Sequence, residues 1–289
     1  MAPTVFPLIY VFFLLMVTAV WGWTFVLVKD AITQYPTLPF LQLRFILAFL
    51  VMAVLVHRLP ARREVRVGVI AGTVLAAGYL TQTVGLTMTS PGNSGLITGL
   101  FVVFTPLIDR LFGVKLRWWT LVAVATALAG TVLLVGGPAG VGLGDVLTIA
   151  CAFLFGLHIV LLSHWSPGLR SAPLAMVQMG SCALIFSGGG SWSLRIPSQD
   201  VWLAIVITGV FASALAFYIQ TWAQQHLSAS RTALILTTEP AWAVAAAVIL
   251  AGQRFGALQA AGAALVLAAI VGHELAHLKF KAHGDEAET

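Results

Sequence analysis

The stretch FPLIYVFFLLMVTAVWGWTFVLV, residues 6–28, contains no charged side chain. A helix of roughly 20 mostly apolar residues is long enough to span a bilayer. No basic residue precedes this run, and its apolar part is longer than that of a signal peptide. We therefore expect residues 6–28 to form a membrane-spanning helix.

Nine further apolar runs of this kind follow along the chain. Only 9% of the 289 residues are charged and 60% are hydrophobic, whereas a typical soluble domain carries roughly 25% charged residues. Short segments separate the runs and leave no room for an attached soluble enzyme. The sequence predicts an all-α polytopic membrane protein with ten transmembrane helices. After residues 6–28, the expected helices cover 38–56, 67–89, 94–112, 118–136, 144–164, 172–190, 200–224, 229–251 and 256–276.

The Lys and Arg residues lie mainly in alternate connections between the runs. If the N-terminus is cytoplasmic, 11 of the 15 cations lie on the cytoplasmic side and three outside, with Arg44 within a run. The positive-inside rule then predicts a multi-pass protein of the plasma (inner) membrane with both termini cytoplasmic. This topology accounts for the net charge of +5, so we expect a bilayer and a small-molecule substrate as partners, and no nucleic acid. Cys151 and Cys182 lie in apolar runs, which argues against a disulfide framework.

The two halves of the chain are similar at corresponding places. Tyr79 and Gln82 occur in the third run, Tyr218 and Gln220 occur in the eighth, and both stretches continue toward a proline in the next run. Each half holds five expected helices, and an odd number places the second half upside down relative to the first. Inverted repeats are the usual construction of a secondary transporter. The predicted domains are a first repeat over 1–137, a second, inverted repeat over 138–278 and a short cytoplasmic tail over 279–289.

At several motifs the chain resembles the EamA-type members of the drug/metabolite transporter superfamily. The most specific stretches are Trp21-Gly22, residues 96–107 (LITGLFVVFTPL), Ala233-Leu234-Ile235-Leu236 and Glu239-Pro240. Residues 252–254, Gly-Gln-Arg, are similar to the family's Gly-Glu-Arg turn, with Gln in place of Glu. The resemblance covers nearly the whole chain.

This resemblance implies a bundle of ten helices in two inverted five-helix repeats. It also implies a central cavity lined by the first, third, fourth, sixth, eighth and ninth helices. The implied activity is export of amino acids or other small metabolites, and the resemblance does not choose among them.

A carrier of polar solutes needs polar groups inside the membrane, and such groups are functional candidates there. Glu239 lies near the middle of the 229–251 run, beside Pro240, which interrupts helical hydrogen bonding. Its carboxyl group could bind a substrate ammonium group or a proton, or it could be a structural, hydrogen-bonded carboxyl. His158 could relay protons or pack as a hydrogen-bonded core residue, and Gln178 is a further polar group in the next run.

Two helical faces combine aromatic rings with polar groups. Tyr79, Gln82 and Thr83 share one face of the 67–89 run because residues three and four apart are neighbours on a helix. Tyr218 and Trp222 lie on a similar face of the 200–224 run. Such faces suit an amphipathic solute, although interhelical hydrogen bonding is an equal alternative. The candidate substrate-binding residues are Trp21, Tyr79, Gln82, Thr83, Phe101, His158, Gln178, Tyr218, Trp222 and Glu239.

Residues 273–277, His-Glu-Leu-Ala-His, match the zincin pattern. Two histidines four residues apart on a helix can bind zinc while the Glu acts as a base. An intramembrane zinc metalloprotease is therefore an alternative. The context is poor, because the motif ends the last run and its third ligand would have to come from His283, Asp285 or a distant loop.

We expect a secondary transporter that works by alternating access and is not an enzyme. It would export amino acids, with aromatic or bulky apolar side chains favoured by the aromatic candidates, or else other metabolites or drugs. No cofactor or metal is expected, and the protein would be a monomer or a weak homodimer.

Overall fold

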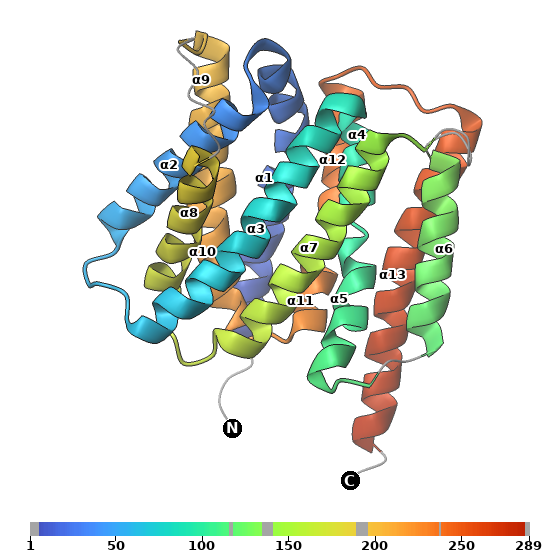
Figure 1. Ribbon diagram of the computed structural model, residues 1–289. Helices are drawn as coiled ribbons and strands as arrows, with labels where there is room; N and C mark the ends of the chain where they lie inside the picture. The colour runs from blue at the N-terminus through green and yellow to red at the C-terminus, as the bar shows by residue number, and fades with distance from the viewer. Residues whose placement is uncertain (1–5, 116–117, 135–140, 189–195, 237, 287–289) are drawn as a thin grey trace.

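A computed structural model describes residues 6–115, 118–134, 141–188, 196–236 and 238–286. The secondary structure in these residues is helical (Figure 1). The first half contains α1 (Phe6–Gln34), α2 (Thr37–Leu55), α3 (Arg62–Met88), α4 (Pro91–Thr98), α5 (Phe101–Asp109), the 3-10 turn η1 (Arg110–Phe112) and α6 (Trp118–Leu134). The second half contains α7 (Leu143–Trp165), α8 (Ser171–Gly188), α9 (Gln199–Val206), the π-helix η3 (Ile207–Leu215), α10 (Ala216–Gln224), α11 (Ala229–Leu236), α12 (Glu239–Ile249) and α13 (Ala257–Glu286).

Each of the ten predicted runs overlaps a helix or a broken helix. Within the described residues, seven helical segments are long and apolar enough to cross a membrane. These findings confirm the all-helical, polytopic fold, and the count of ten spans stays a prediction for 118–136, 229–251 and 256–276. The predicted boundary at 137/138 lies outside the described residues, and α13 continues as a helix into the predicted tail.

Two of the spans are interrupted near the middle of the bundle. The segment 91–112 breaks at Gly99 and Leu100, where 3-10-type hydrogen bonds join Leu100 N to Ile97 O and Val103 N to Leu100 O. The other interrupted span consists of α11, which ends at Leu236, and α12, which begins at Glu239. In both spans the proline lies within the helix that follows the interruption and not at the interruption itself. Pro106 lies inside α5, and Pro240 lies in the first turn of α12, where its missing N–H costs no helical hydrogen bond.

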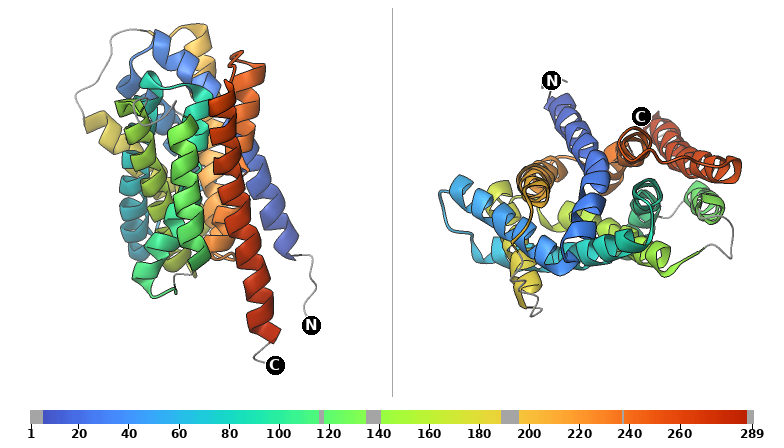
Figure 2. Two further views of the ribbon diagram at one scale, coloured as in Figure 1. Left: turned by 90° about the vertical axis from the view of Figure 1, so that its right-hand side faces the viewer. Right: turned by 90° about the horizontal axis from the view of Figure 1, so that it is seen from above.

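The helices pack as a bundle with α6 and α13 paired at one edge (Figures 1 and 2). In the first half α3 packs against α7 and α8, while in the second half the broken helix α9–η3–α10 packs against α1 and α2. Likewise α1 packs against α12, and α7 packs against α4 and α5. The contact pattern is therefore preserved when the two halves are exchanged.

Small residues allow the interrupted helices to approach each other closely. A Cβ added at Gly95 would lie 2.2 Å from Ala243 Cβ, and one added at Gly99 would lie 2.3 Å from Pro240 Cγ. Gly95 on α4 and Gly99, which follows the last residue of α4, therefore both need to be glycine for this contact with α12. Small residues spaced four apart allow close approach of this kind between membrane helices.

The first described residue of α1 and the end of α13 lie at one end of the bundle, which we call the terminal face (Figure 1). Here Arg170 donates to both carboxylate oxygens of Glu64, at 2.9 and 2.7 Å, and joins the start of α3 to the α7–α8 connection. These hydrogen bonds raise the pKa of Arg170 above its ordinary value. The His164 Nε2 atom lies 2.6 Å from Asp109 Oδ1, and this contact joins α7 to α5.

Other contacts join the helices at the opposite face. Lys29 Nζ donates to the carbonyl oxygens of Leu86, Thr87 and Thr89 at 2.6, 3.1 and 3.1 Å, and so ties α1 to the end of α3. A cation is favoured at a helix C-terminus by the helix dipole. The Gln253 Oε1 atom accepts a hydrogen bond of 3.1 Å from a backbone N–H at the start of α4. The Gln253 amide thus makes a contact with α4 at the position where EamA-type sequences carry a glutamate.

Candidate functional site

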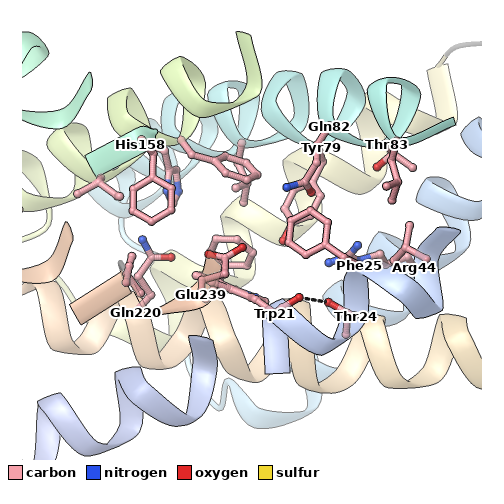
Figure 3. A pocket seen from close by; sticks show the side chains of 18 residues that line it. Trp21, Thr24, Phe25, Arg44, Tyr79, Gln82, Thr83, His158, Gln220 and Glu239 are labelled. Carbon is pink, nitrogen blue, oxygen red and sulfur yellow. Dashed lines mark hydrogen bonds between the residues drawn. The ribbon is translucent and has the colours of Figure 1, made fainter. Parts of the chain in front are cut away.

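A cavity lies among the helices of both halves of the chain (Figure 3). The space between its walls, counted to its open mouth, is about 630 Å³. Its walls come from α1, α2, α3, α5, α7, α10, α11 and α12. The resemblance implied most of these segments, and the contribution of α2 is an addition to them.

Helical spacing brings two continuous walls to the cavity. From α1 the lining residues are Trp21, Thr24, Phe25 and Val28, and from α3 they are Leu75, Tyr79, Gln82, Thr83 and Leu86. Each set repeats at three and four residues and therefore occupies one helix face. The predicted face of Tyr79, Gln82 and Thr83 thus points into the cavity, and Gln82 Nε2 also donates to Thr98 Oγ1 over 3.3 Å.

Several aromatic rings that contact one another line the cavity. The Tyr79 ring centroid lies 5.4 Å from that of Phe155 and 6.0 Å from that of Phe217. The Trp21 ring lies 5.3 Å from Phe217, and its indole N–H donates to the carbonyl oxygen of Ala212 over 2.8 Å. Edge-to-face and tilted contacts at these distances are favourable for aromatic pairs. The lining therefore offers apolar ring surface to the body of a solute.

Arg44 of α2 is a buried cation in the cavity wall. Only 3% of it is exposed, its Nε donates to Ser213 Oγ over 2.9 Å, and its Cζ lies 4.5 Å from the Tyr79 ring centroid. A guanidinium group over a ring face is attracted by the quadrupole of the ring. In the sequence, Arg44 stands out as a cation within an apolar run. That position alone does not show whether its side chain faces a cavity.

Glu239 and Gln220 lie at another part of the wall. Glu239 is 5% exposed and sits in the first turn of α12, where the helix dipole favours a carboxylate. Gln220 of α10 is 2% exposed and donates from Nε2 to Gln224 Oε1 over 3.0 Å. Figure 3 shows both side chains facing the same space. The sequence indicates Gln220 only as part of the repeat, and Gln220 is not among the predicted site residues.

His158 also lines the cavity and is held by a polar network behind it. Its Nε2 lies 2.8 Å from Gln178 Oε1, and Gln178 Nε2 donates to Thr221 Oγ1 over 3.2 Å. Gln178 itself is buried outside the lining. The amide therefore orients the imidazole ring and does not face the cavity.

The structure brings seven of the ten predicted residues to the cavity and leaves three outside it. The residues that line it are Trp21, Tyr79, Gln82, Thr83, Phe101, His158 and Glu239. Besides Gln178, Tyr218 packs against the core cluster that contains Tyr79 and Phe217 but is not itself in the lining, and Trp222 packs against Tyr10 at a ring-centroid distance of 4.5 Å. On α10 the cavity side belongs to Phe217 and Gln220, three residues apart, and the predicted residues Tyr218 and Trp222 lie outside the lining.

The zincin motif receives no support. The backbone of residues 273–277 lies in α13, but the side chains of His273, Glu274 and His277 lie outside the described part of the structure. Among the side chains that are described, no group of three or more His, Cys, Asp or Glu could hold a metal ion.

A bundle of apolar helices around a cavity with polar and aromatic walls is typical of a membrane protein that admits a solute to its interior. Residues 8–136 and 142–273 each match the EamA-like transporter family. The chain belongs to this family, within the drug/metabolite transporter superfamily, and is a membrane transporter of small molecules.

Curated relatives and a solved structure are similar over most of the chain. An uncharacterized transporter of Archaeoglobus fulgidus is 29% identical, over 89% of this chain and 83% of the relative. The uncharacterized inner membrane transporter YedA of Escherichia coli K12 is 26% identical, over 87% and 86%. A probable amino-acid metabolite efflux pump of the same strain is 25% identical, over 88% and 90%. A crystal structure 21% identical covers 89% of this chain and 93% of its own, with a TM-score of 0.65, and supports the fold alone.

Proposed function

We propose that the protein is a secondary transporter that exports amino acids by alternating access, with a preference for aromatic or bulky apolar side chains. The observation that carries the proposal is a central cavity whose walls combine aromatic rings with buried charged and amide groups. Such a lining suits a solute with one apolar part and a few polar groups. A relative named as a probable amino-acid metabolite efflux pump supports the same substrate class.

The proposed mechanism needs two halves that rock against each other around the site. Two inverted five-helix repeats, 1–137 and 138–278, would provide them. The separate family matches over 8–136 and 142–273 support this division. So does the contact pattern, in which the third span of each half packs against the first two spans of the other half.

The protein is proposed to lie in the inner membrane with both termini in the cytoplasm, as a monomer or a weak homodimer. The relative YedA is named as an inner membrane transporter, which supports a location in the inner membrane. The excess of Lys and Arg on the terminal face supports the placement of that face in the cytoplasm. Glu239 is the candidate for proton coupling because it is a carboxyl group in the cavity wall.

Uptake into proteoliposomes that hold the purified protein tests this function. Labelled amino acids are supplied with and without a pH gradient. We expect saturable uptake of aromatic or bulky apolar amino acids, with loss of uptake in Tyr79→Ala and Gln82→Ala. Stimulation by the pH gradient that disappears in Glu239→Gln would support proton coupling. Folded protein that carries no amino acid, but carries nucleosides, sugars or drugs, would contradict the proposed substrate class while leaving the carrier intact.

A further inference from the structure

Two buried side chains of opposite charge line the cavity from different helices. Arg44 comes from α2 and Glu239 from α12. Their charged atoms are more than 4 Å apart, and neither has an ion-pair partner among the described residues. Ionisable groups within a membrane are costly, and they usually pair with one another or mark a substrate pathway. The cavity therefore presents a cation and a carboxyl group at separate places on its wall.

Hydrogen-bond acceptors gather at the Glu239 end. The Gln220 Nε2 atom donates to Gln224, but Gln220 Oε1 is buried and has no hydrogen-bond partner in the part of the chain that the structure describes. Figure 3 shows Gln220 and Glu239 beside the same space. A buried acceptor without a donor is costly unless a ligand supplies one. An ammonium group supplies three donors and no acceptor, so it matches a carboxylate with an adjacent amide oxygen.

Hydrogen-bond donors lie at the Arg44 end. Ser213 accepts from Nε and fixes one side of the guanidinium, and the Tyr79 ring 4.5 Å from Cζ supports its face. The two terminal nitrogens carry four further N–H groups in the planar fork that binds carboxylates in two hydrogen bonds. Arginine held in this way is preorganised, which lowers the entropy cost of binding an anion.

Aromatic surface separates the two ends. Tyr79 projects into the space between Glu239 and Arg44, with Trp21 and Phe25 close by (Figure 3). We propose that the cavity is a two-ended site for a zwitterion: Arg44 binds the carboxylate, Glu239 and Gln220 Oε1 bind the ammonium group, and the rings contact the apolar body. This inference rests on the proposed transport function and adds the residues that select the substrate.

Binding to the unaltered purified protein tests the proposal without any substitution. The probes are phenylalanine, 3-phenylpropanoate and 2-phenylethylamine, with leucine, 4-methylpentanoate and 3-methylbutylamine as an aliphatic set. Each analogue lacks one of the two charged groups. Because a hydrogen bond to a charged group contributes enough for roughly a tenfold to hundredfold change in affinity, we expect both analogues to bind at least about tenfold more weakly than their amino acid. Equal binding of the amino acid and either analogue would overturn the proposal.

Two substitutions then assign the ends. Glu239→Gln should reduce the protein's preference for the amino acid over the carboxylate analogue. Its preference for the amino acid over the amine analogue should stay unchanged. Arg44→Gln should do the reverse, and Arg44→Lys should restore part of the lost preference. Asp30→Asn and Arg66→Gln remove exposed charges outside the lining and should change neither preference. A merely structural role would weaken all three probes alike, and that result would overturn the assignment.

Transport by the unaltered protein separates this inference from the proposed function. If amino acids are carried but the two substitutions move no preference, the two-ended site is wrong and the exporter proposal stands. If only a zwitterion other than an amino acid is carried, the amino-acid proposal is wrong and the site stands. If only uncharged or singly charged solutes are carried, both are wrong.

Discussion

Trp21 has two roles at once. Its ring faces the cavity and lies 5.3 Å from the Phe217 ring, while its indole N–H is hydrogen-bonded to Ala212 within the π-helix η3. A π-helix pairs backbone groups five residues apart and is often found at functional sites. Trp21 therefore joins α1 to the segment that sets the orientation of α10, which carries Phe217 and Gln220.

Trp21→Phe tests the second role, the hydrogen bond to Ala212. Phenylalanine keeps an aromatic ring but loses the N–H donor, so we expect the free energy of unfolding to fall by about 1 kcal/mol. The measurement is the melting temperature of the purified protein. Trp202→Phe changes an exposed tryptophan and should shift stability by less than about 0.5 kcal/mol. An equal loss of stability in both variants would contradict a specific role for the Trp21–Ala212 hydrogen bond.

A helical face marked by residue type predicted part of the cavity lining. Tyr79, Gln82 and Thr83 share such a face, and all three line the cavity. Single polar residues gave a weaker signal. His158 and Glu239 were predicted as polar groups inside the membrane and line the cavity. Arg44 and Gln220 were not selected, because a lone polar residue on an apolar helix does not reveal which neighbour it faces. The partners that orient them, Ser213 and Gln224, come from packing and from local helix geometry.

At the scale of elements, the crossing of α4 and α12 brings the two interrupted spans together. Gly95 contacts Ala243, and Gly99 contacts Pro240, beside Glu239 in the first turn of α12. Close packing there sets where the Glu239 carboxyl group enters the cavity. The crossing is therefore a structural support of the candidate site.

Gly95→Ala should destabilise this crossing. The new methyl group would lie 2.2 Å from Ala243 Cβ, so α4 and α12 would have to separate. Overpacking of this kind costs about 1–3 kcal/mol, and a lower melting temperature of the purified protein measures it. Gly188→Ala adds the same methyl group where nothing lies within 4 Å and should have little effect. The double variant Gly95→Ala/Ala243→Gly removes the opposing methyl group and should recover stability; no recovery would contradict this explanation.

Hydropathy predicted where the helices lie, because each span must be apolar over its length. It could not predict the break at Gly99 and Leu100, because those two residues lie within a continuous apolar run. Nor could it predict the π-helix η3, which packs against α1 and α2 and whose residues are apolar like those of the α-helical segments on either side. Hydropathy also does not fix the rotation of a helix about its axis, which is why Tyr218 and Trp222 could be expected at the cavity although they lie outside its lining.

At the scale of the whole molecule, α3 is fastened at both ends to different partners. Glu64 holds it to Arg170 at the terminal face, and Lys29 holds it to α1 at the opposite face. Alternating access requires a cavity to open toward one side at a time. These two contacts are therefore candidates for latches that oppose opening at their own face.

Breaking each latch should raise access to the cavity from the face of that latch and lower access from the other face. The probe is Gln82→Cys in the cavity wall, in a protein whose two cysteines, Cys151 and Cys182, are replaced by alanine. A membrane-impermeant maleimide is added to either side of oriented vesicles. Because a charged hydrogen bond contributes about 1.5–3 kcal/mol, Lys29→Ala should raise labelling from the opposite face roughly tenfold or more, and Glu64→Gln should do so from the terminal face.

The control variants keep both latches and remove a neighbouring exposed charge. Asp30→Asn adjoins Lys29 in the sequence, Arg66→Gln follows Glu64 by two residues, and neither should alter labelling. Faster labelling from both faces in Lys29→Ala or in Glu64→Gln would mean that the substitution loosens the bundle as a whole. Faster labelling from one face, with slower labelling from the other, is the result that only a shift between two alternative arrangements can produce, because a population moved toward one opening is removed from the other.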